Sequence, residues 1–335
     1  MLNVAAIQRH MPARMKYFLK RYYRTFFPNR LILIFNPTYR CNYRCSYCPV
    51  VTKFDYTTVF AKSGEKSVAD WLRAFEQLPP AMIYVAGGEP FVYAGLPEIV
   101  NELPARHQLV GIVTNLSQDL RLYRKIKKKI HMNASFHREF VTQDAFLAKI
   151  KALRDQFHIN VNIVATPENL PLIEEIDRDM TGHGVTMHVD PYVDIRFRYT
   201  PEQRAILDRC LRSDRNPDSQ LDFDDFSVKS CSAGRNYINL APNGDVYTCN
   251  GGMHYIHSTL YTGFAVGMDV RQFAMGNLFD PAFALNRTDI RCSLPCKEAC
   301  DRDSVAIRRI GPAPSAVRPA GLASAPGSPC PPTTS

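Results

Sequence analysis

LILIFNPTYRCNYRCSYC, residues 31–48, is the stretch that decides the fold. Its first five residues are all apolar, which predicts a buried strand over 31–35, because a short apolar run that ends in turn residues is typical of a strand covered on both faces. Cys41, Cys45 and Cys48 follow on one short loop. The stretch therefore predicts a buried strand with three thiols beyond its carboxyl end.

Strands and helices alternate after this stretch. The apolar patterns predict further strands at 82–86, 109–114, 131–136, 159–165 and 185–190. They predict helices at 67–78, with Ser67 as the N-cap, and at 96–103, 118–130, 142–156, 170–180 and 201–212. Six strands that alternate with helices predict an α/β fold, a partial (β/α)6 TIM-like barrel, with its chemistry at the carboxyl ends of the strands.

Composition divides the chain into four parts. Residues 1–30 form a basic N-terminal segment, 31–214 the barrel, 215–310 a small cysteine-rich extension, and 311–335 a tail that contains seven prolines. Such a tail is expected to be disordered, because it is too poor in apolar residues to bury a core. Cys330 lies within the tail and is not expected to bind a metal.

Charge and hydropathy limit the partners. The net charge is +9, but residues 1–30 and 121–129 together carry thirteen basic residues and no acid, so the rest of the chain has a charge of −4. A nucleic-acid groove is therefore not expected, and each basic cluster is either a solvated face or a docking site for an acidic electron donor. No apolar run is long enough for a membrane span or a signal peptide, so we expect a soluble, cytoplasmic protein. In that compartment ten cysteines favour metal ligands over disulfides.

The loop Cys41-x3-Cys45-x2-Cys48 has a spacing that suits an iron-sulfur cluster. Three thiolates leave the fourth iron of a cubane open for a small molecule, whereas structural zinc needs a fourth ligand. With Tyr47 before the third cysteine, the loop resembles that of the radical S-adenosylmethionine (SAM) superfamily. The resemblance implies a 4Fe-4S cluster on these cysteines, with SAM bound to it and Tyr47 beside it.

The same resemblance assigns roles at the next strand ends. Gly87, Gly88, Glu89 and Pro90 form a GGEP motif, which in this superfamily supports the amino group of SAM. A carboxylate and exposed backbone acceptors suit an ammonium group, although an ordinary turn would also explain the motif. Thr114, Asn115 and Ser135 are the candidates for the remaining cofactor wall.

A second group of cysteines lies in the extension. Cys231, Gly244 and Cys249 resemble the start of the SPASM or twitch extension of the superfamily, which implies an auxiliary 4Fe-4S cluster. Five cysteines are present where one cluster needs four. The favoured ligands are Cys231, Cys292, Cys296 and Cys300, with Cys249 free. In the alternative, family spacing makes Cys231 and Cys249 ligands and leaves one of the last three cysteines spare.

A free thiol predicts the type of reaction. A thiol can return a hydrogen atom to a carbon radical, which inverts the centre, so we expect an epimerase with Cys249 as the hydrogen donor. Only 40 residues precede Cys41, fewer than a typical leader-peptide domain needs, which favours a small substrate.

Residues 31–310 resemble the aminoglycoside epimerases, which implies inversion of one sugar carbon, as in neomycin C to neomycin B. Such a cationic substrate would suit acidic residues, for which the candidates are Asp190, Asp194, Asp222, Asp224 and Asp225. Flavodoxin or ferredoxin would supply the electrons. The alternatives are a sugar-alcohol or aminocyclitol dehydrogenase, a peptide-modifying enzyme, and a non-catalytic iron-sulfur scaffold.

Overall fold

The computed structural model describes residues 30–48, 50, 56–61, 64–192, 197, 199–210, 227–257, 269–294 and 305–312, without the side chains of 61, 210 and 270. Several expectations lie outside these residues. They are the basic segment before Arg30, the tail beyond 312, the ligands Cys296 and Cys300, and the acids Asp194, Asp222, Asp224 and Asp225. Within the described residues, no helix has the length and apolar content of a membrane span.

A curved parallel sheet forms the centre of the molecule. Its first six strands are β1 (Leu31–Phe35), β2 (Ala81–Val85), β3 (Gln108–Thr114), β4 (His131–Ser135), β5 (His158–Ala165) and β6 (Thr186–Pro191), and each pairs in parallel with the next. These bounds agree with the predicted strands to within one residue. The expected partial barrel is therefore confirmed.

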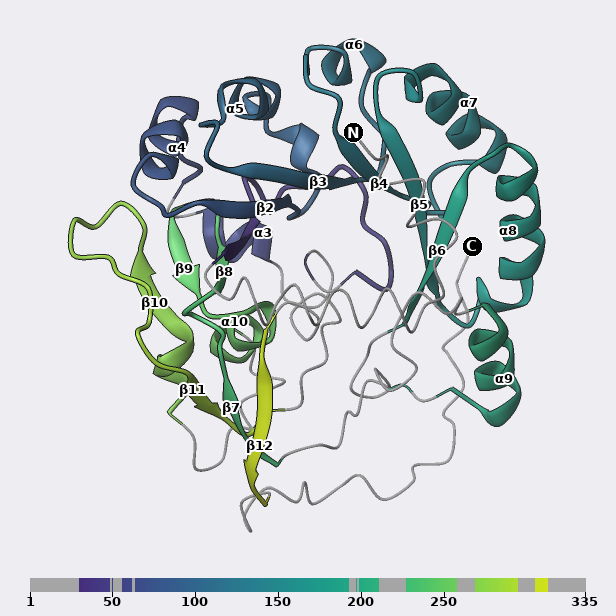
Figure 1. Ribbon diagram of the computed structural model, residues 1–335. Helices are drawn as coiled ribbons and strands as arrows, with labels where there is room; N and C mark the ends of the chain where they lie inside the picture. The colour runs from purple at the N-terminus through teal and green to yellow at the C-terminus, as the bar shows by residue number, and fades with distance from the viewer. Residues whose placement is uncertain are drawn as a thin grey trace, which may run out of the picture.

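Helices cover the convex face of this sheet (Figure 1). They are α4 (Val68–Phe75), α5 (Leu96–Glu102), α6 (Leu120–Tyr123), α7 (Gln143–Leu153), α8 (Ile173–Gly182) and α9 (Pro201–Cys210). Ser67 caps α4 as predicted, since its hydroxyl accepts a hydrogen bond from the backbone N–H of Asp70. Between α4 and the sheet, Phe35 packs edge-on against Trp71 and Phe75, with ring centroids 4.9 and 5.2 Å apart.

The helix predicted over 118–130 is mostly wrong. Only Leu120–Tyr123 is helical, and the chain then runs as turns to β4. Like charges four residues apart, such as Lys125 and Lys129, destabilise a helix. The Asn101 side chain also binds the turn, accepting from Lys127 N at 2.8 Å and donating to the Lys125 carbonyl at 2.9 Å.

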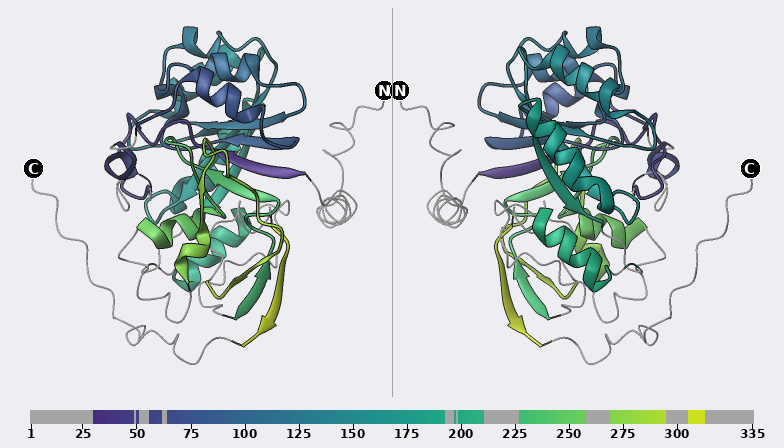
Figure 2. Two further views of the ribbon diagram at one scale, coloured as in Figure 1. Left: turned by 90° about the vertical axis from the view of Figure 1, so that its left-hand side faces the viewer. Right: turned by 90° about the vertical axis from the view of Figure 1, so that its right-hand side faces the viewer.

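The extension adds strands to this sheet and also forms a small sheet of its own. Strand β8 (Tyr237–Leu240) pairs in parallel with β1, and β9 (Asp245–Tyr247) and β10 (Ala274–Asn277) follow antiparallel. Gly244, in the β8–β9 turn, has a positive φ of 92°, a conformation that glycine adopts readily. A second sheet contains β7 (Val228–Cys231), β11 (Ile290–Cys292) and β12 (Ile307–Gly311). Figure 2 shows this small sheet at the opposite end of the molecule from α5 and α6.

Candidate functional site

The GGEP motif lies directly against the chain that enters the cysteine loop. Gly88 N donates to the Thr38 carbonyl at 3.0 Å, and Glu89 N donates to the Arg40 carbonyl at 2.9 Å. A methyl group on Gly87 would lie 2.3 Å from the Thr38 oxygen, and one on Gly88 would lie 2.3 Å from the Arg40 oxygen. Only glycine permits such close backbone contact. The two glycines are therefore required by the cysteine loop itself.

Glu89 joins the ends of β2 and β3. Its carboxylate is 1% exposed and accepts hydrogen bonds from Thr114 Oγ1 at 2.8 Å, Asn115 N at 2.7 Å and Phe91 N at 3.1 Å. Burial raises its pKa to about 7, although these hydrogen bonds act in the opposite direction. Pro90 follows, buried, at the start of a 3-10 helix (Pro90–Val92). Because a carboxylate has about four acceptor positions, one remains for a ligand such as an ammonium group.

Asn115 faces the cysteine loop from the end of β3. Its side-chain amide donates to Asn42 Oδ1 at 3.1 Å and approaches Cys41 Sγ at 3.9 Å. Ser117 Oγ donates to the same Asn42 oxygen at 3.1 Å. Ser135, the last residue of β4, is half-buried. The structure thus brings Asn115 and Glu89 to the cysteine loop, whereas Asn42 was not anticipated.

The three loop thiols suit iron as ligands. Burial raises the pKa of Cys41 to about 11, and burial together with the charge of Cys48 raises that of Cys45 to about 12. Neutral thiols of this kind lose their protons when they bind a metal. Within the described part of the chain, no group of three His, Cys, Asp or Glu side chains is arranged to bind a single metal ion. In a cubane each cysteine binds a different iron, and three thiols on one loop are the donor set of a cluster that keeps its fourth iron open.

Residues after β4 hold the cysteine loop on its other side. Tyr47 lies over His137, with its hydroxyl 2.7 Å from His137 Nδ1 and the two rings stacked at 20°. Burial lowers the pKa of His137 to about 4, so the ring is neutral at neutral pH, with one nitrogen as a donor and the other as an acceptor. Cys45 Sγ lies 3.2 Å from His137 Nδ1.

Two further contacts secure the residues between the cysteines. Glu139 accepts from Ser46 N at 3.1 Å and from Ser46 Oγ at 2.9 Å. Phe140 stacks on Tyr43, with centroids 4.5 Å apart. These residues were not anticipated, and the one available signal was their position directly after Ser135, at a carboxyl strand end.

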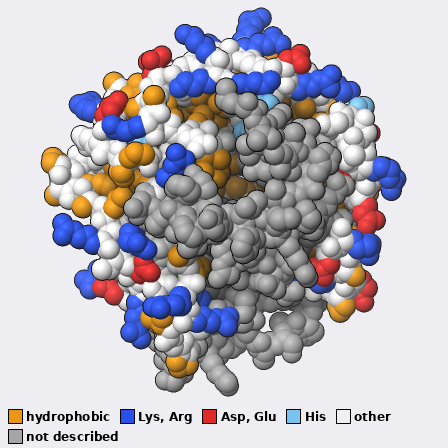
Figure 3. All heavy atoms as spheres, viewed as in Figure 1, with side chains coloured by type: hydrophobic (Ala, Val, Ile, Leu, Met, Phe, Trp, Pro, Cys, Tyr) orange, Lys and Arg blue, Asp and Glu red, His pale blue; other side chains and the backbone are white. Residues whose placement is uncertain are grey.

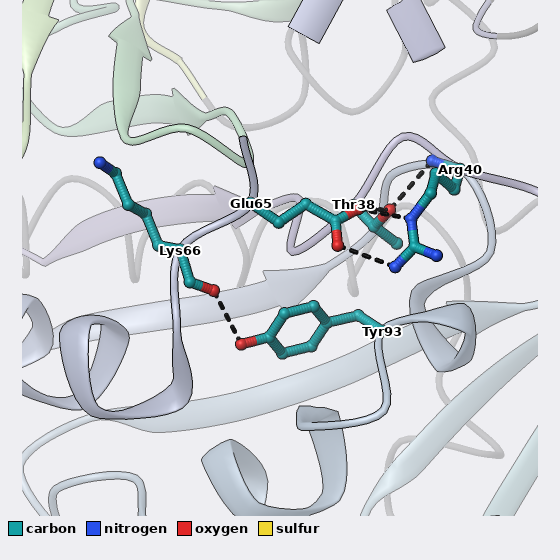
Figure 4. A network of polar contacts seen from close by, with 5 residues as sticks. All are labelled: Thr38, Arg40, Glu65, Lys66 and Tyr93. Atoms are coloured by element: carbon teal, nitrogen blue, oxygen red, sulfur yellow. Dashed lines mark hydrogen bonds and ion pairs between the residues drawn. The ribbon is translucent and has the colours of Figure 1, made fainter. Parts of the chain in front are cut away.

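Glu65 links the base of the cysteine loop to a neighbouring segment (Figure 4). Its carboxylate accepts from Thr38 Oγ1, and from Arg40 Nε and Nη2 at 2.8 Å each. The carbonyl of the next residue, Lys66, accepts from the Tyr93 hydroxyl at 2.9 Å. Lys66 N donates to the Pro242 carbonyl at 3.1 Å, so this segment also contacts the extension.

Three cysteines of the extension line one pocket. They are Cys231 on β7, Cys292 on β11 and Cys249, and they line it together with Lys229 and apolar side chains. Lys229 is 5% exposed and donates to the carbonyls of Ser227 at 2.9 Å and Leu294 at 3.3 Å. Burial raises the pKa of Cys292. The structure therefore groups Cys249 with two of the predicted ligands, and its role as hydrogen donor stays a prediction.

The sequence Asn250-Gly251-Gly252, directly after Cys249, predicts a flexible turn, and this prediction is wrong. Asn250–His257 forms helix α10, whose Gly252 packs against Phe273 so closely that a methyl group would lie 2.6 Å from the ring. Gly252 N also donates to Cys249 Sγ at 3.1 Å. The glycine thus serves helix packing rather than flexibility, because only a residue without a side chain fits against Phe273.

Helix α10 also contacts the segment that follows the cysteine loop. The Tyr56 hydroxyl, on α3 (Tyr56–Ala61), is hydrogen-bonded to His254 Nδ1, and the rings are stacked at 11°. Tyr39 donates to Met253 Sδ at 3.4 Å. Tyr39 and Tyr56, on either side of the cysteine loop in sequence, therefore both contact the helix that follows Cys249.

The acidic and basic candidates lie as follows. Asp190 is half-buried on β6. The basic side chains of 121–129 are exposed, and Lys and Arg gather along the top of the molecule, over α6, in Figure 3. Lys127, Lys128 and Lys129 directly precede β4, at the amino edge of the sheet, whereas the cysteine loop lies at the carboxyl edge. Docking of an electron donor at this basic cluster stays a prediction. The length of β4 separates the cluster from the thiols.

Comparisons with known proteins agree with this geometry. Residues 35–186 match the family model described as the radical SAM superfamily. The chain is similar to the GTP 3',8-cyclase of Aquifex aeolicus, with 22% identity over 65% of this chain and 81% of that protein. It is also similar to the PqqA peptide cyclase of Granulibacter bethesdensis, with 25% identity over 80% of this chain and 79% of that protein.

Solved structures share the fold. The structure of anSMEcpe with bound AdoMet and Cp18Cys peptide matches with a TM-score of 0.50 and 12% identity, over 75% of this chain and 78% of that chain. SuiB of Streptococcus suis matches with a TM-score of 0.50 and 18% identity, over 69% of this chain and 62% of that chain. The chain thus spans less than two thirds of SuiB, and at these identities the likeness concerns the fold.

Proposed function

Because residues 35–186 match the radical SAM superfamily model, we propose that the chain is an enzyme that binds a 4Fe-4S cluster and SAM at the loop Cys41–Cys48. One observation carries the proposal: the loop with its three thiols lies against Gly88 on one side and His137 on the other. The chemistry that the bound cluster and SAM supply is one-electron cleavage of SAM, which gives a radical able to remove hydrogen from an unactivated carbon.

The surrounding residues bind and orient. Asn115 and Asn42 form one polar wall, and Tyr47, held by neutral His137, forms an aromatic one. We assign the amino group of SAM to the vicinity of Glu89, whose ionised carboxylate would form a charge-assisted hydrogen bond with it. A bound ammonium group would lower the pKa of Glu89, and so favour the charged form at neutral pH.

Iron content tests the proposal. With an auxiliary cluster present, anaerobically reconstituted protein should hold about eight irons, falling to about four when Cys41, Cys45 and Cys48 are all replaced by alanine. Cys330→Ala is the control and should keep all its iron. Protein that takes up zinc and no iron, or that binds iron without cleaving SAM after reduction, contradicts the proposal; the second result would point to the scaffold.

For the reaction itself we propose epimerisation of a small aminoglycoside substrate at one sugar carbon, as in the conversion of neomycin C to neomycin B. Cys249 is the candidate hydrogen donor, and Cys231, Cys292, Cys296 and Cys300 the candidate ligands of the auxiliary cluster. The Cys249 S–H bond breaks as the new C–H bond forms, and the thiyl radical regains one electron and one proton. A flavodoxin or ferredoxin would be the source of that electron.

A second candidate is oxidation of a substrate radical, as in a dehydrogenase or a peptide-modifying enzyme. The pocket favours it, because Cys249 borders the same space as Cys231 and Cys292 and so is also available as a ligand. The likeness to a peptide cyclase over 80% of the chain favours it as well. In this reaction an auxiliary cluster would accept the second electron of the substrate, a proton would leave to solvent, and no thiol would return hydrogen.

Cys249→Ala separates the two candidates. If Cys249 donates hydrogen, the variant keeps its iron and still cleaves SAM with the substrate present, but yields no inverted product. Wild-type enzyme in D2O then places one deuterium on the inverted carbon, because a thiol proton exchanges with water. Loss of about half of the iron in Cys249→Ala, or an oxidised product without deuterium, contradicts the epimerase and supports the second candidate.

A further inference from the structure

Lys149 of α7 binds the loop that follows β3. Its ammonium nitrogen lies 2.7 Å from the Leu116 carbonyl oxygen, 2.9 Å from that of Ser117 and 3.1 Å from that of Gln118. An ammonium group has three N–H donors, so three consecutive carbonyls use all of them. The contact joins α7 to the segment that presents Asn115.

The loop needs such a contact. Leu116 has φ of 52°, the one positive value among the described non-glycine residues, and its side chain is 1% exposed. This backbone conformation costs about 1 kcal/mol or more in a residue with a side chain, and persists where its surroundings impose it. Three carbonyl oxygens that converge on one point also repel one another, and a cation between them offsets that repulsion.

The loop Leu116–Gln118, which Lys149 binds, fixes the position of Asn115. Asn115 N donates to Glu89, Ser117 N donates to Asn115 Oδ1 at 2.9 Å, and the Asn115 amide reaches Asn42 on the cysteine loop. A shift of the Leu116–Gln118 carbonyls would therefore move the amide away from Cys41. Lys149 is half-buried, and burial lowers its pKa, whereas Asp119 and Glu89 raise it.

We propose that Lys149 is a positioning residue for the SAM site, acting through the Leu116–Gln118 carbonyls on Asn115. The inference rests on the proposed binding of SAM. Lys149 lies on α7, in the outer helical layer of the barrel, and would fix Asn115 at the carboxyl edge of the sheet. Because the hydrogen bonds of Lys149 go to the carbonyls of this loop, its effect on SAM is indirect.

The test compares Lys149→Met with Lys151→Met, an exposed position on the same helix. Both should keep their iron, whereas Lys149→Met alone should bind SAM about tenfold more weakly, as expected for loss of charge-assisted hydrogen bonds. SAM should also alter the electron paramagnetic resonance of the reduced cluster less in Lys149→Met. Lys149→Arg, which keeps the charge and several donors, should recover part of the affinity. Equal affinity and equal spectra in the two methionine variants overturn the inference.

A second measurement does not depend on SAM. Hydrogen exchange of peptides covering 114–118 should be at least several-fold faster in Lys149→Met than in Lys151→Met, and unchanged protection overturns the inference. If Lys149→Met does not fold, Lys149→Gln, which keeps two donors without the charge, is measured in the same way. If wild-type protein with its iron binds no SAM, the proposed function fails, while the exchange result still decides whether Lys149 fixes the loop.

Discussion

Tyr47 and His137 form one unit: the phenol hydroxyl lies 2.7 Å from the imidazole Nδ1 while the rings stack 6.0 Å apart. The hydrogen bond and the stacking together fix the orientation of Tyr47, which lies between Cys45 and Cys48. His137, which follows β4, thus determines the orientation of Tyr47 in the cysteine loop.

Tyr47→Phe should keep the ring but lose this orientation. We expect normal iron content and a several-fold weaker affinity for SAM, because a net hydrogen bond contributes about 1 kcal/mol. Equilibrium dialysis of the reconstituted variant measures it. Tyr43→Phe, in the same loop, keeps its stacking on Phe140 and is the control. Equal affinities in the two variants would show that the hydroxyl of Tyr47 has no role in SAM binding.

Gly88→Ala should prevent cluster assembly. The new methyl group would lie 2.3 Å from the Arg40 carbonyl oxygen and 2.6 Å from that of Tyr39, so the base of the loop must move. We expect about 1–3 kcal/mol lower stability, as for other overpacked sites, and loss of the iron bound by the loop. Gly182→Ala, where a methyl group meets open space, is the matched control. Full iron content in Gly88→Ala would refute the close contact.

Glu89 should make the iron-free protein less stable as pH rises. Its pKa is raised from 4.5 to about 7, so the folded state binds more protons than the unfolded state between these values. Stability therefore falls from pH 4.5 to 7, by up to about 3 kcal/mol, and the loss is complete above pH 7. Urea unfolding at pH 5 and pH 8 should show this fall in the wild type.

Glu89→Gln removes the titrating group and should flatten that dependence. The variant should also assemble its clusters yet bind SAM more weakly, because it lacks the carboxylate. An identical pH dependence in wild type and variant would contradict the burial argument, and an unchanged SAM affinity would reduce the motif to a structural turn.

Glu65→Gln should loosen the base of the cysteine loop with little effect on overall stability. The bidentate ion pair with Arg40 is partly exposed, and such pairs contribute about 1 kcal/mol or less. We expect faster release of iron to a chelator than in wild type. Glu174→Gln, which removes the exposed pair with Arg209 elsewhere, is the control. Equal release rates in the two variants would refute the role of Glu65.

Local patterns predict the strands and the cysteine loop because their signals lie within a few residues. Ser67 and Gly244 could be assigned in the same way, since a cap and a turn are local structures. His137 and Lys149 could not, because their contacts depend on which loops meet at the carboxyl edge. The helix α10 was missed for a similar reason: the pair Gly251-Gly252 indicates a turn, and only the packing of Phe273 against Gly252 overrides it.

The pairing of β1 with both β2 and β8 sets the order in which the site can be completed during synthesis. The partner for one edge of β1, residues 81–85, is synthesised soon after β1 itself. The partner for the other edge, residues 237–240, is synthesised much later. At about 5–20 residues per second, that second partner emerges some tens of seconds later. The strand leading to Cys41 therefore keeps an open edge until residues 237–240 have been synthesised. If iron were inserted before that edge is paired, the nascent chain would already contain the three thiols but would not yet hold them in place.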